Sequence, residues 1–91
     1  MTSGAATQVF SSRYDQRFFK FPPAVQRQIE LRVDELGRRL KDFPHTRMQG
    51  VNAFRLRVGD YRVIYRFDVV QNILFLVAVG HRRDVYETLS N

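Results

Sequence analysis

Arginine is the residue type in this sequence whose number and spacing point most clearly to a chemical function. Between positions 47 and 83, seven arginines stand against two acidic residues and no lysine, a balance of +5 within a net charge of +6. The seven are Arg47, Arg55, Arg57, Arg62, Arg66, Arg82 and Arg83. Guanidinium groups bind phosphate or carboxylate through paired hydrogen bonds. The pattern favours an anion-binding surface, with a solvated basic face as the alternative.

The segment FRLRVGDYRVIYRF, residues 54–67, predicts a β-hairpin that positions four of these arginines. Residues alternate with a period of two on both sides of Gly59-Asp60, which fits a two-residue turn. This turn sets the register, which pairs Val58 with Tyr61, Arg57 with Arg62, Leu56 with Val63 and Arg55 with Ile64. Because opposed residues share a face, we expect the arginines on one face and the apolar residues on the other.

Arg57 and Arg62 are expected to lie directly opposite each other. Two like charges in this position are mildly destabilising, so stability offers no reason for the pair. An anion shared by several guanidinium groups offers one. The alternative is local neutralisation by Asp60, Asp68 or Asp84.

The remaining helices and strands are predicted from the periodicity of apolar residues and from the prolines and glycines that interrupt it. We expect a strand at Gln8 to Phe10, a Ser-capped helix from about Arg13 to Lys20, a helix from Pro23 to about Lys41, a loop at 45–53, a central strand at Ile73 to Val79 that is buried on both faces, and a short helical tail within His81 to Leu89. The second helix carries a single apolar stripe.

These elements predict an α+β fold of two layers. Two N-terminal helices pack on a mostly antiparallel four-stranded sheet, in the order β-α-α-β-β-β, with a short C-terminal helical tail. We expect residues 1–91 to form a single domain, since so short a chain relies on one core. An apolar content of 44% argues against a disordered chain.

Composition also limits the classes of protein. Cysteine is absent from the sequence, which removes disulfides and thiolate metal sites, and the two histidines are far apart, so we expect no metal and no other cofactor. The first eight residues do not resemble a signal peptide, and the apolar run from Ile73 to Val79 is too short to span a bilayer. We therefore expect a cytoplasmic protein without membrane contact.

Three segments together carry a family resemblance: LRVGDYRVIY, ILFLVAVG and VGHRRDVY. They resemble the RelE/ParE superfamily of bacterial and archaeal toxins, whose layout also begins with two helices followed by three strands. The resemblance implies the toxin of a type II toxin-antitoxin system, neutralised by a cognate antitoxin that alone contacts operator DNA. The RelE branch implies cleavage of mRNA in the ribosomal A site. The alternatives are a ParE-like gyrase inhibitor without nuclease activity and a catalytically degenerate RNA-binding relative.

The resemblance to the RelE branch also implies site residues. By position in the motifs, its functional residues correspond to Arg55, Arg57, Arg62, Arg82 and Tyr86. Because the ParE branch is not expected to keep this whole set, we favour RNA cleavage without metal, by attack of the 2′-hydroxyl on the adjacent phosphate. We expect Arg62 and Arg82 to clamp that phosphate. Further RNA contacts are expected from four arginines: Arg55, Arg57, Arg66 and Arg83.

Proton transfer needs another residue, because arginine stays protonated. Relatives often have lysine where this chain has Arg55 or Arg57. His81 is the candidate acid or base, with a structural histidine as the alternative. Tyr86 is expected to stack on a base or orient the 2′-hydroxyl, unless it is a core aromatic, and His45 is expected to be structural. Without a compact acid–base pair, we expect the enzyme to depend on the ribosome for alignment of the mRNA.

Overall fold

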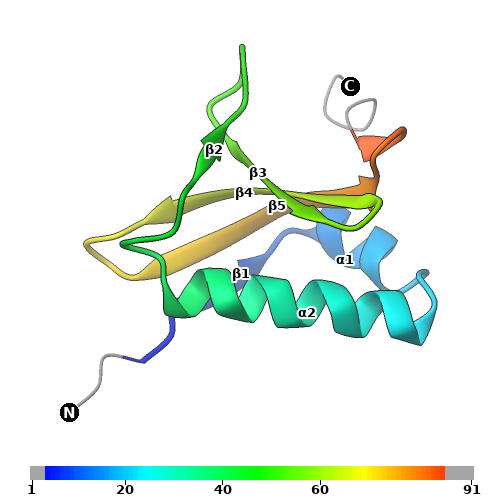
Figure 1. The fold of residues 1–91 in the computed structure, drawn as a ribbon, viewed down its shortest axis with the longest axis horizontal. Coiled ribbons are helices and arrows are strands. Elements are labelled where there is room, and N and C mark those ends of the chain that lie inside the picture. The colour runs from blue at the N-terminus through cyan, green and yellow to red at the C-terminus, as the bar shows by residue number, and fades with distance from the viewer. Residues whose placement is uncertain (1–3, 86–91) are drawn as a thin grey trace.

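The structure is a computed structural model in which residues 4–85 are described. Its elements are β1 (Thr7–Phe10), α1 (Ser12–Phe18), α2 (Pro23–Arg38), β2 (Thr46–Arg47), β3 (Phe54–Val58), β4 (Tyr61–Asp68) and β5 (Ile73–His81). Both helices lie on one side of the sheet, and α2 runs along it (Figure 1). The predicted two-layer α+β fold is confirmed. The predicted tail beyond Val85 lies outside the described residues.

The sheet has five strands in the order β1-β5-β4-β3-β2, not the four that were predicted. The additional strand, β2, lies within the predicted loop and is an edge strand of two exposed residues, too short to show any alternation. β1 pairs with β5 in parallel, and the other neighbours are antiparallel. β4 therefore lies at the centre, where β5 was expected. β5 also runs two residues further than predicted, to His81, and exposes Phe75 on one face.

The helices form where the sequence predicts them, and both end earlier: α1 spans Ser12–Phe18 rather than about Arg13 to Lys20. The hydroxyl of Ser11 accepts a hydrogen bond from the Tyr14 amide at 3.0 Å and caps α1. Pro23 begins α2, which ends at Arg38 rather than near Lys41. The apolar stripe of α2 faces the sheet and packs against β3, β4 and β5 to form the core. In residues 4–85, no helix combines the length and the apolar character that a bilayer crossing requires.

His45 has the structural role that the sequence predicts. Its ring stacks on Phe67 at a centroid distance of 3.9 Å. Nε2 lies 2.8 Å from the Leu40 carbonyl oxygen, and Nδ1 lies 2.7 Å from the Tyr65 hydroxyl. Since a carbonyl only accepts, Nε2 carries the proton and Nδ1 accepts from Tyr65. This bridge ties the end of α2 to the centre of the sheet.

Replacing Tyr65 by phenylalanine is expected to destabilise the protein by about 1–2 kcal/mol, because His45 Nδ1 loses its donor in a largely buried cluster. Urea unfolding followed by circular dichroism measures this change. Tyr61→Phe is the matched control, since Tyr61 is half-buried and no described residue bonds to its hydroxyl. Equal stability of the two variants would contradict a structural role for the bridge.

Candidate functional site

The β3–β4 hairpin has the predicted register. Arg57 lies opposite Arg62, and Arg55 lies opposite Ile64. Gly59, the first residue of the turn, has a φ of 59°, a conformation that glycine adopts without strain. The side chains of these pairs point away from the helices. We call this side of the sheet the arginine face.

Arg66 lies on the arginine face but apart from the Arg57–Arg62 pair. It is four residues from Arg62 along β4, which corresponds to roughly 13 Å. Its partner on β5 is Phe75, whose side chain is 36% exposed. A single phosphate therefore cannot bridge Arg66 and Arg62, and Arg66 can contact only a more distant part of a ligand.

Backbone carbonyl groups, rather than a carboxylate, hold Arg62. Its Nη1 donates to the carbonyl oxygens of Gly59 and Tyr61, both at 2.9 Å. These bonds orient the guanidinium and leave its charge without a countercharge from the turn. Two ion pairs lie in and beside α2, and another joins Arg82 Nε to Asp60 Oδ1 at 4.0 Å. That pair is solvent-exposed and worth little.

The same turn also places Arg82. The Arg82 amide donates to the Asp60 carbonyl oxygen at 2.8 Å, which fastens the segment after β5 to the β3–β4 turn. The turn at Gly59–Tyr61 thus holds both arginines that were predicted to clamp phosphate, one through its side chain and the other through its backbone. Arg83 follows directly and is exposed.

His81 does not lie with these arginines. It pairs with Tyr61, so its side chain points to the helical side of the sheet, opposite to Arg62. Its ring meets Tyr61 edge-on at a centroid distance of 5.7 Å, and Nδ1 accepts the Arg83 amide at 3.3 Å. The ring therefore lies on the helical side of the sheet and contacts the backbone of the turn that carries Arg82 and Arg83.

An apolar cluster interrupts the arginine face, which the sequence analysis missed. Ile64 is fully buried there with Ala53, Ala78 and Val85. Val85 packs closely over Gly80: a Cβ at Gly80 would lie 3.4 Å from Val85. The chain after β5 folds back over the sheet at this point. The signal was Ile64 itself, an apolar residue at a position where its neighbours on the same face are arginines.

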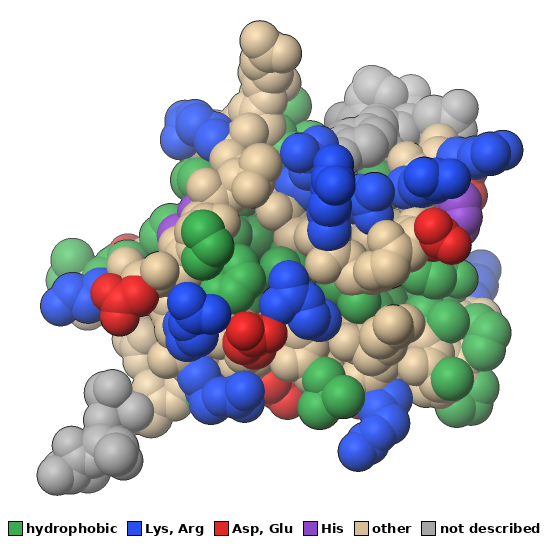
Figure 2. Space-filling view, in the orientation of Figure 1, with side chains coloured by type: hydrophobic (Ala, Val, Ile, Leu, Met, Phe, Trp, Pro, Cys, Tyr) green, Lys and Arg blue, Asp and Glu red, His purple; other side chains and the backbone are tan. Residues whose placement is uncertain are grey.

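Basic side chains gather on the arginine face around this cluster. Figure 2 shows a group of them over the upper side of the sheet, continuing towards the C-terminal end of the described chain. Tyr86, the predicted terminal aromatic, lies outside the described residues. Within the described part of the chain, no group of three or more His, Cys, Asp or Glu side chains could hold a metal ion. The chemistry that this face offers is the binding of anions by several arginines.

Two helices on one face of a five-stranded mixed sheet match the small toxin fold of the RelE/ParE superfamily. A family model, described as the ParE toxin of the type II toxin-antitoxin system parDE, matches residues 10–86. The chain belongs to this toxin family. No match was found among curated proteins.

Solved structures agree with this assignment at the level of the fold. The chain is similar to one from the RelBE2 toxin-antitoxin complex of Mycobacterium tuberculosis, with a TM-score of 0.72 and 24% identity over 91% of this chain and 98% of that chain. The intact Escherichia coli RelBE complex gives 0.71 and 20% identity over 85% and 96%. The archaeal RelE-RelB complex of Pyrococcus horikoshii gives 0.70 and 20% over 86% and 96%.

Proposed function

We propose that this toxin cleaves mRNA on the ribosome and is neutralised by a cognate antitoxin. The observation that carries the nuclease proposal is the Arg57–Arg62 pair, two opposed arginines on the sheet face that the helices leave uncovered. An RNA phosphate between them would offset the repulsion that the empty pair carries. The toxin-antitoxin complexes among the structural neighbours support the antitoxin partner.

The reaction needs no metal. The 2′-hydroxyl oxygen attacks the adjacent phosphorus while the bond from phosphorus to the 5′-oxygen breaks. A base takes the 2′ proton and an acid supplies a proton to the departing oxygen, leaving a 2′,3′-cyclic phosphate and a 5′-hydroxyl. Arg62 and Arg82, held by one turn, would stabilise the charge that develops on the phosphorane oxygens. Arg55 and Arg57 would hold the scissile phosphate and its neighbours, with Arg66 and Arg83 further along the RNA.

The His81 ring lies on the face of the sheet opposite to Arg62, which argues against a direct acid–base role for His81. We therefore expect His81→Ala to lower cleavage by less than the roughly tenfold or more that loss of a general acid or base causes. The smaller loss would come from the missing hydrogen bond in which the Arg83 amide donates to His81 Nδ1. His81→Asn, which keeps an acceptor on the side chain, should restore part of the loss.

The dependence of the cleavage rate on pH separates the two roles of His81. If it only positions the turn, His81→Ala keeps the shape of the wild-type profile. A loss well above tenfold, together with disappearance of one limb of the wild-type pH profile, would make His81 the acid or base. In the first case, Tyr86 becomes the leading candidate for proton transfer.

Primer extension on translating ribosomes tests the nuclease proposal. Wild-type protein should produce new 3′ ends within ribosome-bound message, and Arg82→Ala should produce far fewer. A second candidate function, inhibition of gyrase without nuclease activity, is favoured by the match to the ParE family model. It predicts intact message and stalled gyrase on supercoiled DNA. Intact message without an effect on gyrase would indicate a degenerate relative that binds RNA.

A further inference from the structure

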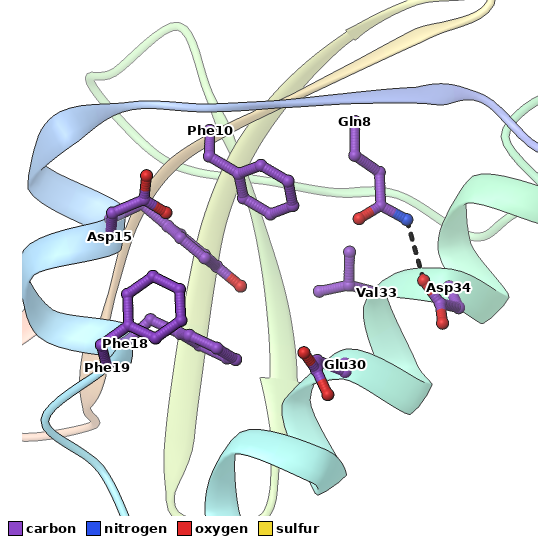
Figure 3. Close-up of a pocket in the computed structure, with 9 residues that line it drawn as sticks. Gln8, Phe10, Asp15, Phe18, Phe19, Glu30, Val33 and Asp34 are labelled. Atoms are coloured by element: carbon purple, nitrogen blue, oxygen red, sulfur yellow. Dashed lines mark hydrogen bonds between the residues drawn. The ribbon is translucent and has the colours of Figure 1, made fainter.

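A cleft of about 550 Å³ lies on the helical side of the molecule, between α2 and the segment formed by β1 and α1 (Figure 3). One wall consists of four aromatic rings in succession: Phe10, Tyr14, Phe18 and Phe19. Their neighbouring centroids are 5.4, 5.6 and 5.2 Å apart. Phe10 is 45% exposed and Phe19 is 69% exposed, so apolar surface continues from the cleft onto the outside of the molecule.

The cleft also collects negative charge in a strongly basic protein. Asp15 lies on the aromatic wall, and Glu30 and Asp34 face it from α2 (Figure 3). In residues 4–85, none of these three carboxylates forms an ion pair with a basic side chain. Asp34 accepts a hydrogen bond from Gln8 at 2.9 Å. We call this feature the aromatic–acidic cleft; carboxylates beside aromatic faces attract cations.

The hydroxyl of Tyr14 gives an independent indication of a ligand. Tyr14 is 2% exposed and lines the cleft, yet no residue in the described part of the chain hydrogen-bonds to its hydroxyl. Burial raises the pKa of this phenol, and the charges of Asp15, Glu30 and Asp34 raise it further. Tyr14 lines the cleft and its hydroxyl is not fully enclosed, so the phenol oxygen opens onto the cleft. A donor bound in the cleft would supply the partner that this hydroxyl lacks among the described residues.

We propose that the aromatic–acidic cleft binds a lysine or arginine side chain carried on an apolar segment of the antitoxin. The aliphatic stem would lie on Phe10 and Phe19, and the cationic head would reach Glu30 and Asp34 and donate to the Tyr14 hydroxyl. This proposal rests on the proposed antitoxin partner. A protein segment fits better than a free cation, since the exposed phenylalanines extend the apolar surface beyond the cleft.

The cleft would also set the specificity of the pairing. The arginine face attracts acidic residues, whereas the aromatic–acidic cleft on the other side of the sheet attracts a basic one. A partner that follows both surfaces needs the two charges at a fixed separation along its chain, and a shifted or foreign partner would place like charges together. The arginines of the toxin would repel the basic residue of the antitoxin at any other position, so one register of the antitoxin is favoured.

The first test uses a small probe, N-butylguanidinium, added to ¹⁵N-labelled protein. We expect saturating NMR shifts at Phe10, Tyr14, Glu30 and Asp34, at least about fivefold weaker binding by Glu30→Gln/Asp34→Asn, and no saturating shifts with 1-pentanol, its neutral counterpart. Asp42→Asn, which removes the charge of an exposed acid outside the cleft, is the control for a change of surface charge. Equal binding of pentanol, or shifts spread over the surface, would refute a cation site.

The second test uses the antitoxin encoded beside the toxin gene. Glu30→Gln/Asp34→Asn should weaken antitoxin binding by about 30-fold, the size expected for a hot spot. One Lys or Arg of the antitoxin should occupy the cleft, so changing that residue to Gln should cause no further loss of binding to the Glu30→Gln/Asp34→Asn toxin. Additive losses at every basic position would refute the proposal. RNA cleavage by the Glu30→Gln/Asp34→Asn toxin should equal wild type, so a failed nuclease proposal would be recognised separately.

Discussion

Replacing Arg62 by alanine is expected to lower ribosome-dependent mRNA cleavage by about 10²–10³-fold, the range measured when one preoriented donor to a developing negative charge is removed. Arg62 is preoriented because Nη1 is bonded to the Gly59 and Tyr61 carbonyl oxygens, which fix the guanidinium before substrate arrives. The rate of appearance of the primer-extension stop, measured at saturating ribosome complex, reports the loss.

Two variants separate this effect from loss of charge or stability. Arg62→Lys keeps the charge but has a single donor group and no planar fork, so we expect it to recover only a small part of the rate. Arg38→Ala removes an exposed arginine at the end of α2, on the opposite side of the sheet, and should cleave like wild type. If all three variants cleaved at the wild-type rate, the arginine face would not be the catalytic surface.

The hairpin that carries Arg62 could be predicted because its register depends on local residues alone. A two-residue turn at Gly59-Asp60 fixes every pair that follows, and the alternation of Arg with Leu, Val and Tyr then assigns the faces. The apolar stripe of α2 was predictable for the same reason, since its period of 3.6 residues needs no knowledge of the partner.

The face of His81 could not be predicted, because a β-bulge sets it. Tyr65 pairs with Leu76, whereas Ile64 pairs with Ala78, so Val77 is an extra residue in β5. With an unbroken register, Arg62 would pair with Val79, and His81 would share the face of Arg62. The bulge moves every later side chain of β5 to the opposite face. No signal within ILFLVAVG marks Val77 as this residue.

The aromatic–acidic cleft and the apolar cluster were missed because each joins segments far apart in the sequence. Glu30 and Asp34 lie on the solvent side of the stripe in α2, where isolated acids usually mean a wet helix face. Only the packing of α1 and β1 beside them turns these positions into one wall of a cleft. Similarly, the fold-back of the chain after Gly80 determines that Ile64 is buried.

Replacing Ile64 by alanine is expected to destabilise the protein by about 2–4 kcal/mol, because a fully buried side chain would leave a cavity beneath the chain after β5. Urea unfolding measures the loss. Val9→Ala is the control: Val9 belongs to the same sheet and is 44% exposed, so its truncation should cost less than about 0.5 kcal/mol.

The Ile64→Ala variant should also show whether Ile64 stabilises the whole fold or mainly the segment that carries Arg82. Val85 packs against Ile64, and the Arg82 amide bonds to the Asp60 carbonyl oxygen, so the two contacts secure opposite ends of one short segment. In Ile64→Ala, hydrogen exchange at Arg82 and Asp84 should accelerate more than exchange in β3. An equal acceleration throughout the sheet would mean that Ile64 supports the fold as a whole. A selective acceleration would mean that the Ile64 side chain holds in place Arg82, the arginine proposed to clamp phosphate.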